Sequence, residues 1–187
     1  MKIGSARAGR LKIMIEFETK ILNVNKETIK FLNTKAILIN KRHLVKRFVY
    51  GLGHKNSNNS WIRILDDNGL SLCYKNYKSY KIGGIDEIEL KTTGKLEDLK
   101  KLLTVLGCKL IAEQHSYESN YEYNGAKIDL EKWPMIPPYL EIEGKNKKSV
   151  LDVIKLMGFD KKDSRPITTK MVYKLYNIDL HKFKRLI

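Results

Sequence analysis

Charged and apolar residues alternate strictly in a short stretch near the start of this chain. The stretch reads IEFETKIL, and as an extended strand it places Glu16, Glu18 and Lys20 on one face. Because successive side chains of a strand point to opposite faces, the other face is apolar and suits a protein core. The pattern therefore predicts a β-sheet protein in which one face of the strand carries acids and a base together.

The same alternation returns twice further along the chain. In IDEIELK the acidic pair is Glu87 and Glu89, and in YLEIEG it is Glu141 and Glu143. In an open sheet, such faces are simply the solvent side. In a closed barrel, alternate residues point inward, and charges buried there without water or partners are costly because they lose their hydration. The two alternatives are an ordinary wet surface and a wet tunnel that receives a charged ligand.

Periodicity and turn residues predict about eight strands with helices among them. Asn68-Gly69 and Asn124-Gly125 are typical of tight hairpin turns, since Asn-Gly favours positive φ. Strands are expected at 15–22, 36–40, 44–50, on both arms of the hairpin 61–75, and at 85–91, 109–117, 119–123, 126–131 and 139–144; helices are expected at 23–35, 96–107, 149–158 and 168–176, with a packed terminal helix at 180–187. This pattern predicts an antiparallel α+β fold, closed into a barrel or strongly curved.

Length and composition limit the organisation of the chain. Its 187 residues suit one domain over 14–187, preceded by a basic N-terminal arm at 1–13. No apolar run approaches the roughly 20 residues of a membrane helix, and no secretory signal is visible, so we expect a cytoplasmic protein without a membrane partner. Cys73 and Cys108 are then expected to be free, buried thiols.

The chain carries a formal net charge of +15, which attracts anionic partners. Its basic residues are spread along the sequence rather than gathered in one block, so a nucleic-acid partner is possible but not favoured. The charged strand faces suggest a more specific ligand. Carboxylate pairs suit hard cations such as Mg²⁺ or Mn²⁺, and Lys and Arg suit phosphate oxygens. A barrel that carries both would suit a metal-bound polyphosphate.

The order of these motifs resembles that of the CYTH, or triphosphate tunnel metalloenzyme, superfamily. The Glu16-Phe-Glu-Thr-Lys20 run looks like its E-x-E-x-K signature, and Arg63 in Trp-Ile-Arg, Lys75 and Asp129 follow in the expected order. The run IDLEKWPMIPPYLEIEG is similar to the corresponding segment of proteins that resemble class IV adenylyl cyclases. The resemblance covers roughly residues 14–157, and the tail also looks like that subgroup.

The resemblance implies an eight-stranded antiparallel β barrel that forms a tunnel, with helices outside it. Members act on triphosphates with a divalent metal: class IV adenylyl cyclases convert ATP to cyclic AMP and pyrophosphate, and others hydrolyse inorganic triphosphate, thiamine triphosphate or an RNA 5′-triphosphate. A CYTH module that binds a nucleotide or phosphorylated ligand without turnover is a further alternative. ATP is the expected small-molecule partner, Mg²⁺ or Mn²⁺ the expected cofactor, and a homodimer is possible.

Site residues follow from the same resemblance, position by position. The metal would be held by Glu16, Glu18, Glu141 and Glu143 with help from Asp129, the phosphates by Lys20, Arg63 and Lys75, and the tunnel would also be lined by Glu87 and Glu89.

Two departures from the family pattern stand out. Leu65 replaces a second arginine often found after Arg63, and the stretch 114–121 contains no Lys or Arg where relatives carry phosphate-binding cations. Each lost charged contact would weaken phosphate binding by about 1–3 kcal/mol. Lys46, Arg47, Lys91 and Lys109 are the candidates to compensate.

Overall fold

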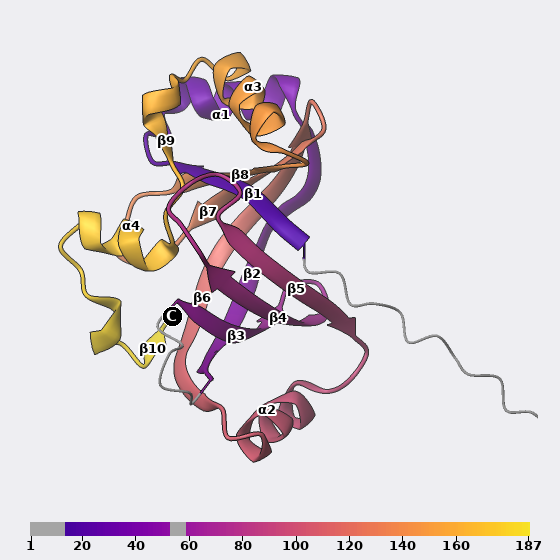
Figure 1. Cartoon of the computed structure of the whole chain (residues 1–187). Coiled ribbons are helices and arrows are strands. Elements are labelled where there is room, and N and C mark those ends of the chain that lie inside the picture. Colours follow the sequence, from indigo (N-terminus) through magenta and orange to yellow (C-terminus); the bar gives the residue numbers. More distant parts are fainter. Residues whose placement is uncertain (1–13, 53–58) are drawn as a thin grey trace, which may run out of the picture.

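Eight antiparallel strands close into a barrel in the computed structural model, which describes residues 14–52 and 59–187 (Figure 1). The order around the barrel is β6-β2-β3-β4-β5-β1-β8-β7, and β7 pairs with β6 to close it. The strands are β1 (Met14–Ile21), β2 (Ile37–Gly51), β3 (Ser60–Asp66), β4 (Leu70–Tyr77), β5 (Ile85–Thr92), β6 (Lys109–Tyr123), β7 (Ala126–Lys132) and β8 (Tyr139–Gly144). The predicted α+β barrel is confirmed. The predicted arm at 1–13 lies outside the described residues.

Four helices pack against the outside of the barrel: α1 (Lys26–Lys35), α2 (Leu96–Val105), α3 (Lys147–Leu156) and α4 (Thr169–Leu175). Asn25 and Asn146 cap α1 and α3, because each side chain accepts a hydrogen bond from the third backbone N–H of its helix. In Figure 1, α1 and α3 lie together at one end of the molecule and α2 lies at the other. None of these helices is long and apolar enough to cross a membrane within the described ranges.

The apolar cores lie between the barrel wall and these helices, not inside the barrel. Ile128 and Ile142 point outward from the wall and pack with Val153 of α3, while Ile64 packs with Leu103 of α2. Because strand side chains alternate between faces, this outward apolar packing leaves the charged face of each strand to the barrel interior.

The structure corrects the division of two strands. The sequence predicts a break after residue 40 and another at 118, but β2 and β6 each continue unbroken for 15 residues. The two strands pair along their length, with register shifts around Asn40 that absorb the polar stretch as bulges. Their polar residues Ser116, Glu118 and Asn120 are buried rather than forming a loop.

The C-terminal segment also differs from the prediction. Residues 180–187 form a 3₁₀ turn, η2 (Leu180–Lys182), and a short strand, β10 (Arg185–Leu186), rather than a helix. β10 lies parallel to β6, and its backbone partners there hold this segment extended. A second short strand, β9 (Ser164–Arg165), pairs with the end of β1 and was not predicted. Cys73 and Cys108 are free as expected, although only Cys73 is fully buried.

Candidate active site

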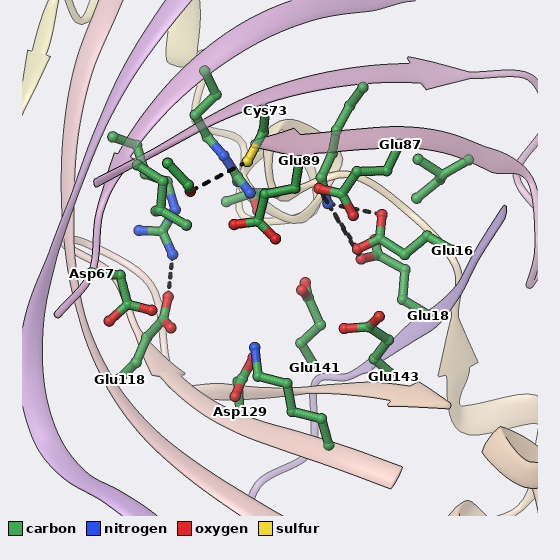
Figure 2. Close-up of a pocket in the computed structure, with 18 of the residues that line it drawn as sticks. Glu16, Glu18, Asp67, Cys73, Glu87, Glu89, Glu118, Asp129, Glu141 and Glu143 are labelled. Carbon is green, nitrogen blue, oxygen red and sulfur yellow. Dashed lines mark hydrogen bonds and ion pairs between the residues drawn. The ribbon is translucent and has the colours of Figure 1, made fainter. Parts of the chain in front are cut away.

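The interior of the barrel is a charged cavity of about 550 Å³. Ten acidic and six basic side chains line it, so the cavity is acidic although the chain as a whole is strongly basic. The acidic residues are Glu16, Glu18, Asp67, Glu87, Glu89, Glu118, Asp129, Glu131, Glu141 and Glu143. The basic residues are Lys20, Arg47, Arg63, Lys75, Lys91 and Lys127. Figure 2 shows the labelled carboxylates arranged around a central space.

All ten residues predicted to form the site lie on this lining. Strand register explains why. β1 and β8 are neighbours, and Glu18 lies directly opposite Glu143 while Lys20 lies opposite Glu141. Residues opposite one another in an antiparallel pair point to the same face. The two carboxylate pairs, separated by more than a hundred residues in the sequence, therefore face the same space (Figure 2). Their individual roles remain predictions.

Lys75 joins three of these carboxylates. Its ammonium nitrogen lies 2.9 and 2.8 Å from the two carboxylate oxygens of Glu16, 3.5 Å from Glu87 and 3.9 Å from Glu18. Lys75 and Glu16 are both more than nine-tenths buried. A charge removed from water in this way needs compensating partners, so Lys75 is the internal counterion of this wall.

Lys20 plays the same part on the opposite side of Glu18. Its ammonium group donates a hydrogen bond to Glu141 and lies 3.7 Å from Glu18. The pKa of Glu141 is lowered to about 2: burial alone would raise it, but the charge of Lys20 and that of Lys75 outweigh burial. Glu141 is therefore ionised throughout the neutral range.

The remaining carboxylates near β1 are less well compensated. Burial, with repulsion from Glu141, raises the pKa of Glu18 to about 8. Burial also raises the pKa of Glu143 to about 7, although Lys127 opposes the shift. A raised carboxyl pKa means that the site disfavours its own negative charge. An added cation would relieve that cost.

This donor set fits a divalent metal by its chemistry. Four carboxylates on two adjacent strands offer only oxygen ligands, which Mg²⁺ and Mn²⁺ prefer. Within residues 14–52 and 59–187, however, no three acidic, histidine or cysteine side chains already converge on one point closely enough to hold a metal. Lys20 and Lys75 hold Glu141 and Glu16 instead. A metal entering here would have to displace these ammonium groups from their carboxylates.

Arg63 is one of two cavity cations, with Lys91, that have no carboxylate partner within residues 14–52 and 59–187. In the described part of the chain it forms no salt bridge, and its Nε atom is buried without a hydrogen-bond partner. Burial would lower the pKa of Arg63, but nearby acids, Glu87 and Glu16 among them, raise it, so the guanidinium stays charged. Leu65 also lines the cavity, as the resemblance suggested for its position. Arg63 is thus the donor best placed to receive an anion.

The candidate residues replace the cations missing from the stretch 114–121 only in part. Arg47 does point into the cavity, but it donates hydrogen bonds to Glu118 and, at 2.7 Å, to Ser116. Lys46 instead pairs with Asp66, and neither side chain lines the cavity. Lys91 lines the cavity. The tunnel therefore has fewer cations free to bind phosphate than its number of lysines and arginines suggests.

Sequence reasoning missed Glu131 and Lys127. Glu131 is buried at the end of β7, where it accepts hydrogen bonds from the Trp133 indole and, at 2.9 Å, from the Tyr139 hydroxyl. Burial, with repulsion from Glu141, raises its pKa to about 8. The alternation of strand faces could have identified them: Lys127 and Glu131 lie two residues before and after the predicted Asp129, and so share its strand face.

Asp129 itself is fully engaged. Lys127 lies 2.9 Å from one of its oxygens, and Asn120 donates to the other at 2.7 Å. The pKa of Asp129 is nevertheless raised, chiefly by burial. Lys127 and Asn120 therefore fix the position of the Asp129 carboxyl group, while burial in the tunnel disfavours its ionised form.

Stability without metal is expected to fall as pH rises from about 5 to about 8. Glu18, Glu131 and Glu143 have folded-state pKa values of about 8, 8 and 7, above the ordinary value of 4.5, so the folded protein holds protons that the unfolded chain releases. Thermal unfolding in a chelating buffer measures this trend. Below about pH 4.5 the trend reverses, because Glu141 has a lowered pKa.

The variant Glu18→Gln isolates one group in that trend. It should flatten the dependence of unfolding temperature on pH between about 6 and 8. An equally steep dependence in the variant would contradict the assigned shift of Glu18.

No protein-family model matches the sequence, and no curated protein matches it. Solved structures do match. The PH1012 protein from Pyrococcus horikoshii OT3 is 21% identical with a TM-score of 0.68, and the match covers 82% of this chain and 96% of that one. A "putative adenylate cyclase" from Vibrio parahaemolyticus is 11% identical with a TM-score of 0.70, covering 87% of this chain and 99% of that one.

A third similar structure is the "putative adenylyl cyclase HpAC1" from Hippeastrum, described as having a dominant triphosphatase activity. It is 13% identical with a TM-score of 0.55, and the match covers 87% of this chain and 96% of that one. At these identities the likeness concerns the fold. The chain shares its fold with these solved structures, and that fold is the eight-stranded antiparallel barrel expected from the resemblance to the CYTH superfamily.

Proposed function

We propose that this protein is a metal-dependent enzyme that acts on a nucleoside triphosphate inside the barrel, converting ATP to cyclic AMP and pyrophosphate as class IV adenylyl cyclases do. The observation that carries the proposal is the meeting of two carboxylate pairs in one cavity with Arg63, which is partly buried and forms no salt bridge with any residue of the described chain. The carboxylates offer a cation site, and the guanidinium offers an anion site beside it. A metal-bound polyphosphate needs both.

Each group then has a defined task. Glu16, Glu18, Glu141 and Glu143 would hold Mg²⁺ or Mn²⁺, which when bound neutralises phosphate charge. Arg63 donates hydrogen bonds to phosphate oxygens. Lys20 and Lys75, which pair with Glu141 and Glu16 in this structure, would donate to the same oxygens if those carboxylates held a metal instead.

The proton of the attacking hydroxyl also needs an acceptor. In a cyclase the nucleophile is the ribose 3′-hydroxyl, and the acceptor must be poised near neutral pH. Asp129 and Glu131 line the cavity and have raised pKa values, the latter about 8. We propose one of these two carboxyl groups, which lie two residues apart on the same strand face, as the acceptor.

Hydrolysis of a triphosphate is the second candidate function. The same cation and anion sites would serve it, with water in place of the ribose hydroxyl. The dominant triphosphatase activity described for the Hippeastrum protein favours it. The scarcity of free cations beside β6, where Glu118 pairs with Arg47 of β2, instead keeps open a module that binds its ligand without turnover.

A panel of triphosphates separates these functions. Purified protein is incubated with ATP, GTP, thiamine triphosphate or inorganic triphosphate, with Mg²⁺, Mn²⁺ or a chelator, and products are identified by mass. Cyclic nucleotide with pyrophosphate supports the cyclase, and released phosphate supports the triphosphatase. Binding without any product would leave a ligand-binding module, and absence of both binding and product would refute the proposal.

Arg63→Ala is expected to weaken triphosphate binding roughly 10- to 100-fold, because a charge-assisted hydrogen bond contributes about 1.5–3 kcal/mol. Calorimetric titration measures this change. The matched control is Arg42→Ala, since Arg42 stacks on Tyr117 and does not line the cavity. Equal affinities of Arg63→Ala and the wild type would exclude Arg63 from the anion site.

A further inference from the structure

We infer that the exposed basic surface formed by residues 145–185, here called the basic flank, binds the phosphate backbone of a nucleic acid. Its members share one property: each is a lysine or arginine whose side chain is exposed. They are Lys145, Lys147, Lys148, Lys155, Lys161, Lys162, Arg165, Lys170, Lys174, Lys182, Lys184 and Arg185. The inference is independent of the tunnel and goes beyond the proposed function.

The basic residues occur throughout the sequence, but the excess of basic over acidic residues is large in 145–187, where the formal net charge is +8 (12 basic minus 4 acidic) out of +15 for the chain. Residues 145–187 contain these twelve basic side chains and four acidic ones, whereas the longer stretch 14–144 contains 20 basic and 17 acidic residues. All ten acids and six bases of the tunnel lining belong to that second stretch. Folding therefore places an acidic interior beside a strongly basic exterior, and a polyanion would be attracted to the exterior.

Most of the flank's charges are available. In the described part of the chain, three of the twelve form ion pairs: Lys148 with Asp152, Lys162 with Asp160, and Arg185 with Glu113. In all three pairs the lysine or arginine side chain is exposed, so the pair contributes little to stability. The other nine have no acidic partner among residues 14–52 and 59–187.

The flank follows one side of the molecule. Figure 1 shows the C-terminal segment running from α3 at one end, past β9 and α4, to β10 beside β6. Exposed cations distributed along this segment suit the repeated phosphates of a nucleic-acid backbone. A small triphosphate would instead need the enclosed cavity that the tunnel provides.

An anionic membrane is the competing partner, and the packing of the helices argues against it. A helix that binds a membrane surface needs a free apolar face to insert. The apolar face of α3 is buried through Val150, Val153 and Ile154, and that of α4 through Val172 and Tyr173. With these faces packed on the protein, the flank offers charge without a continuous apolar side.

The test uses charge reversal with a matched control. The flank variant combines Lys155→Glu, Lys161→Glu, Lys170→Glu and Lys174→Glu. The control variant makes the same change of net charge at four exposed lysines elsewhere: Lys30→Glu, Lys41→Glu, Lys95→Glu and Lys101→Glu. Binding of a single-stranded oligonucleotide of about 20 nucleotides is followed by fluorescence anisotropy over a range of salt concentrations.

We expect the flank variant to bind at least 30-fold more weakly than the wild type, and the control variant less than 3-fold more weakly. The slope of log affinity against log salt should decrease by about 3 in the flank variant, since roughly four phosphate contacts are lost. A version with the same four lysines changed to glutamine should give the smaller effect of neutralisation. Thermal unfolding and triphosphate turnover should be unchanged in all three.

Three results would overturn the inference. The first is no oligonucleotide binding by the wild type at about 0.1 M salt. The second is equal weakening by the flank and control variants, which would mean that net charge alone drives association. The third is binding to vesicles of anionic phospholipid, lost in the flank variant, with no binding to the oligonucleotide.

Discussion

Replacement of Glu16 or Glu143 by alanine is expected to lower metal-dependent triphosphate turnover at least 100-fold. The two residues lie on adjacent strands and line one cavity, and each belongs to one of the two carboxylate pairs proposed to hold the metal. Removing one ligand leaves the metal with too few oxygens to stay bound or to neutralise phosphate charge. Product formation over a Mn²⁺ titration measures the effect, because a weakened metal site shows as a shift to higher metal concentration.

Glu27→Ala is the matched control for these variants, since Glu27 is an exposed glutamate in the first turn of α1. Its turnover should equal that of the wild type. Unfolding curves must show that the tunnel variants remain folded; Glu143→Ala should be at least as stable as the wild type, because it removes a carboxylate whose charge the site disfavours. Unchanged turnover in both tunnel variants would refute the metal site.

Lys75→Met is expected to lower the free energy of unfolding by about 3–5 kcal/mol at neutral pH. The substitution keeps a long side chain but leaves Glu16, Glu18 and Glu87 without their shared cation. The loss should diminish as pH falls from about 8 towards 5, because Glu16 and Glu18 would then take up protons and their repulsion would disappear. Urea unfolding at several pH values in a chelating buffer measures both effects.

Lys78→Met is the control for this prediction. Lys78 also pairs with a carboxylate, Asp86, at 2.6 Å, but its side chain is 61% exposed. Loss of such a surface pair should cost no more than about 1 kcal/mol. If Mn²⁺ restores stability to Lys75→Met more than to the wild type, the metal and the ammonium group compete for the same carboxylates. Similar stabilities of the Lys75→Met and Lys78→Met proteins would show that Lys75 is not the internal counterion of the tunnel.

Much of the fold could be read from local patterns. Strand alternation, the Asn-Gly turns and the leucine spacing of α2 are set by neighbours in the sequence, and the structure confirms them: Asn68 and Asn124 have φ values of 49° and 50° at their hairpin turns. The predicted breaks within β2 and β6 were wrong because their polar residues resemble a loop, and the local sequence does not show which strand they pair with. Pairing between the two strands keeps Asn40 and Glu118 extended.

The sequence by itself determined which residues could form a charged face: the alternation of Glu16, Glu18, Lys20, Glu141 and Glu143 with apolar residues is a property of the chain. Only the tertiary structure decided that this face is the inside of a barrel, since closure depends on β7 pairing with β6. It also decided which cations remain free. Arg47 and Arg63 look equally basic in sequence, but Glu118 lies within reach of Arg47 and no carboxylate in the described chain pairs with Arg63. Charge pairing acts over a few ångströms, and distances of that kind between remote segments exist only once the chain has folded.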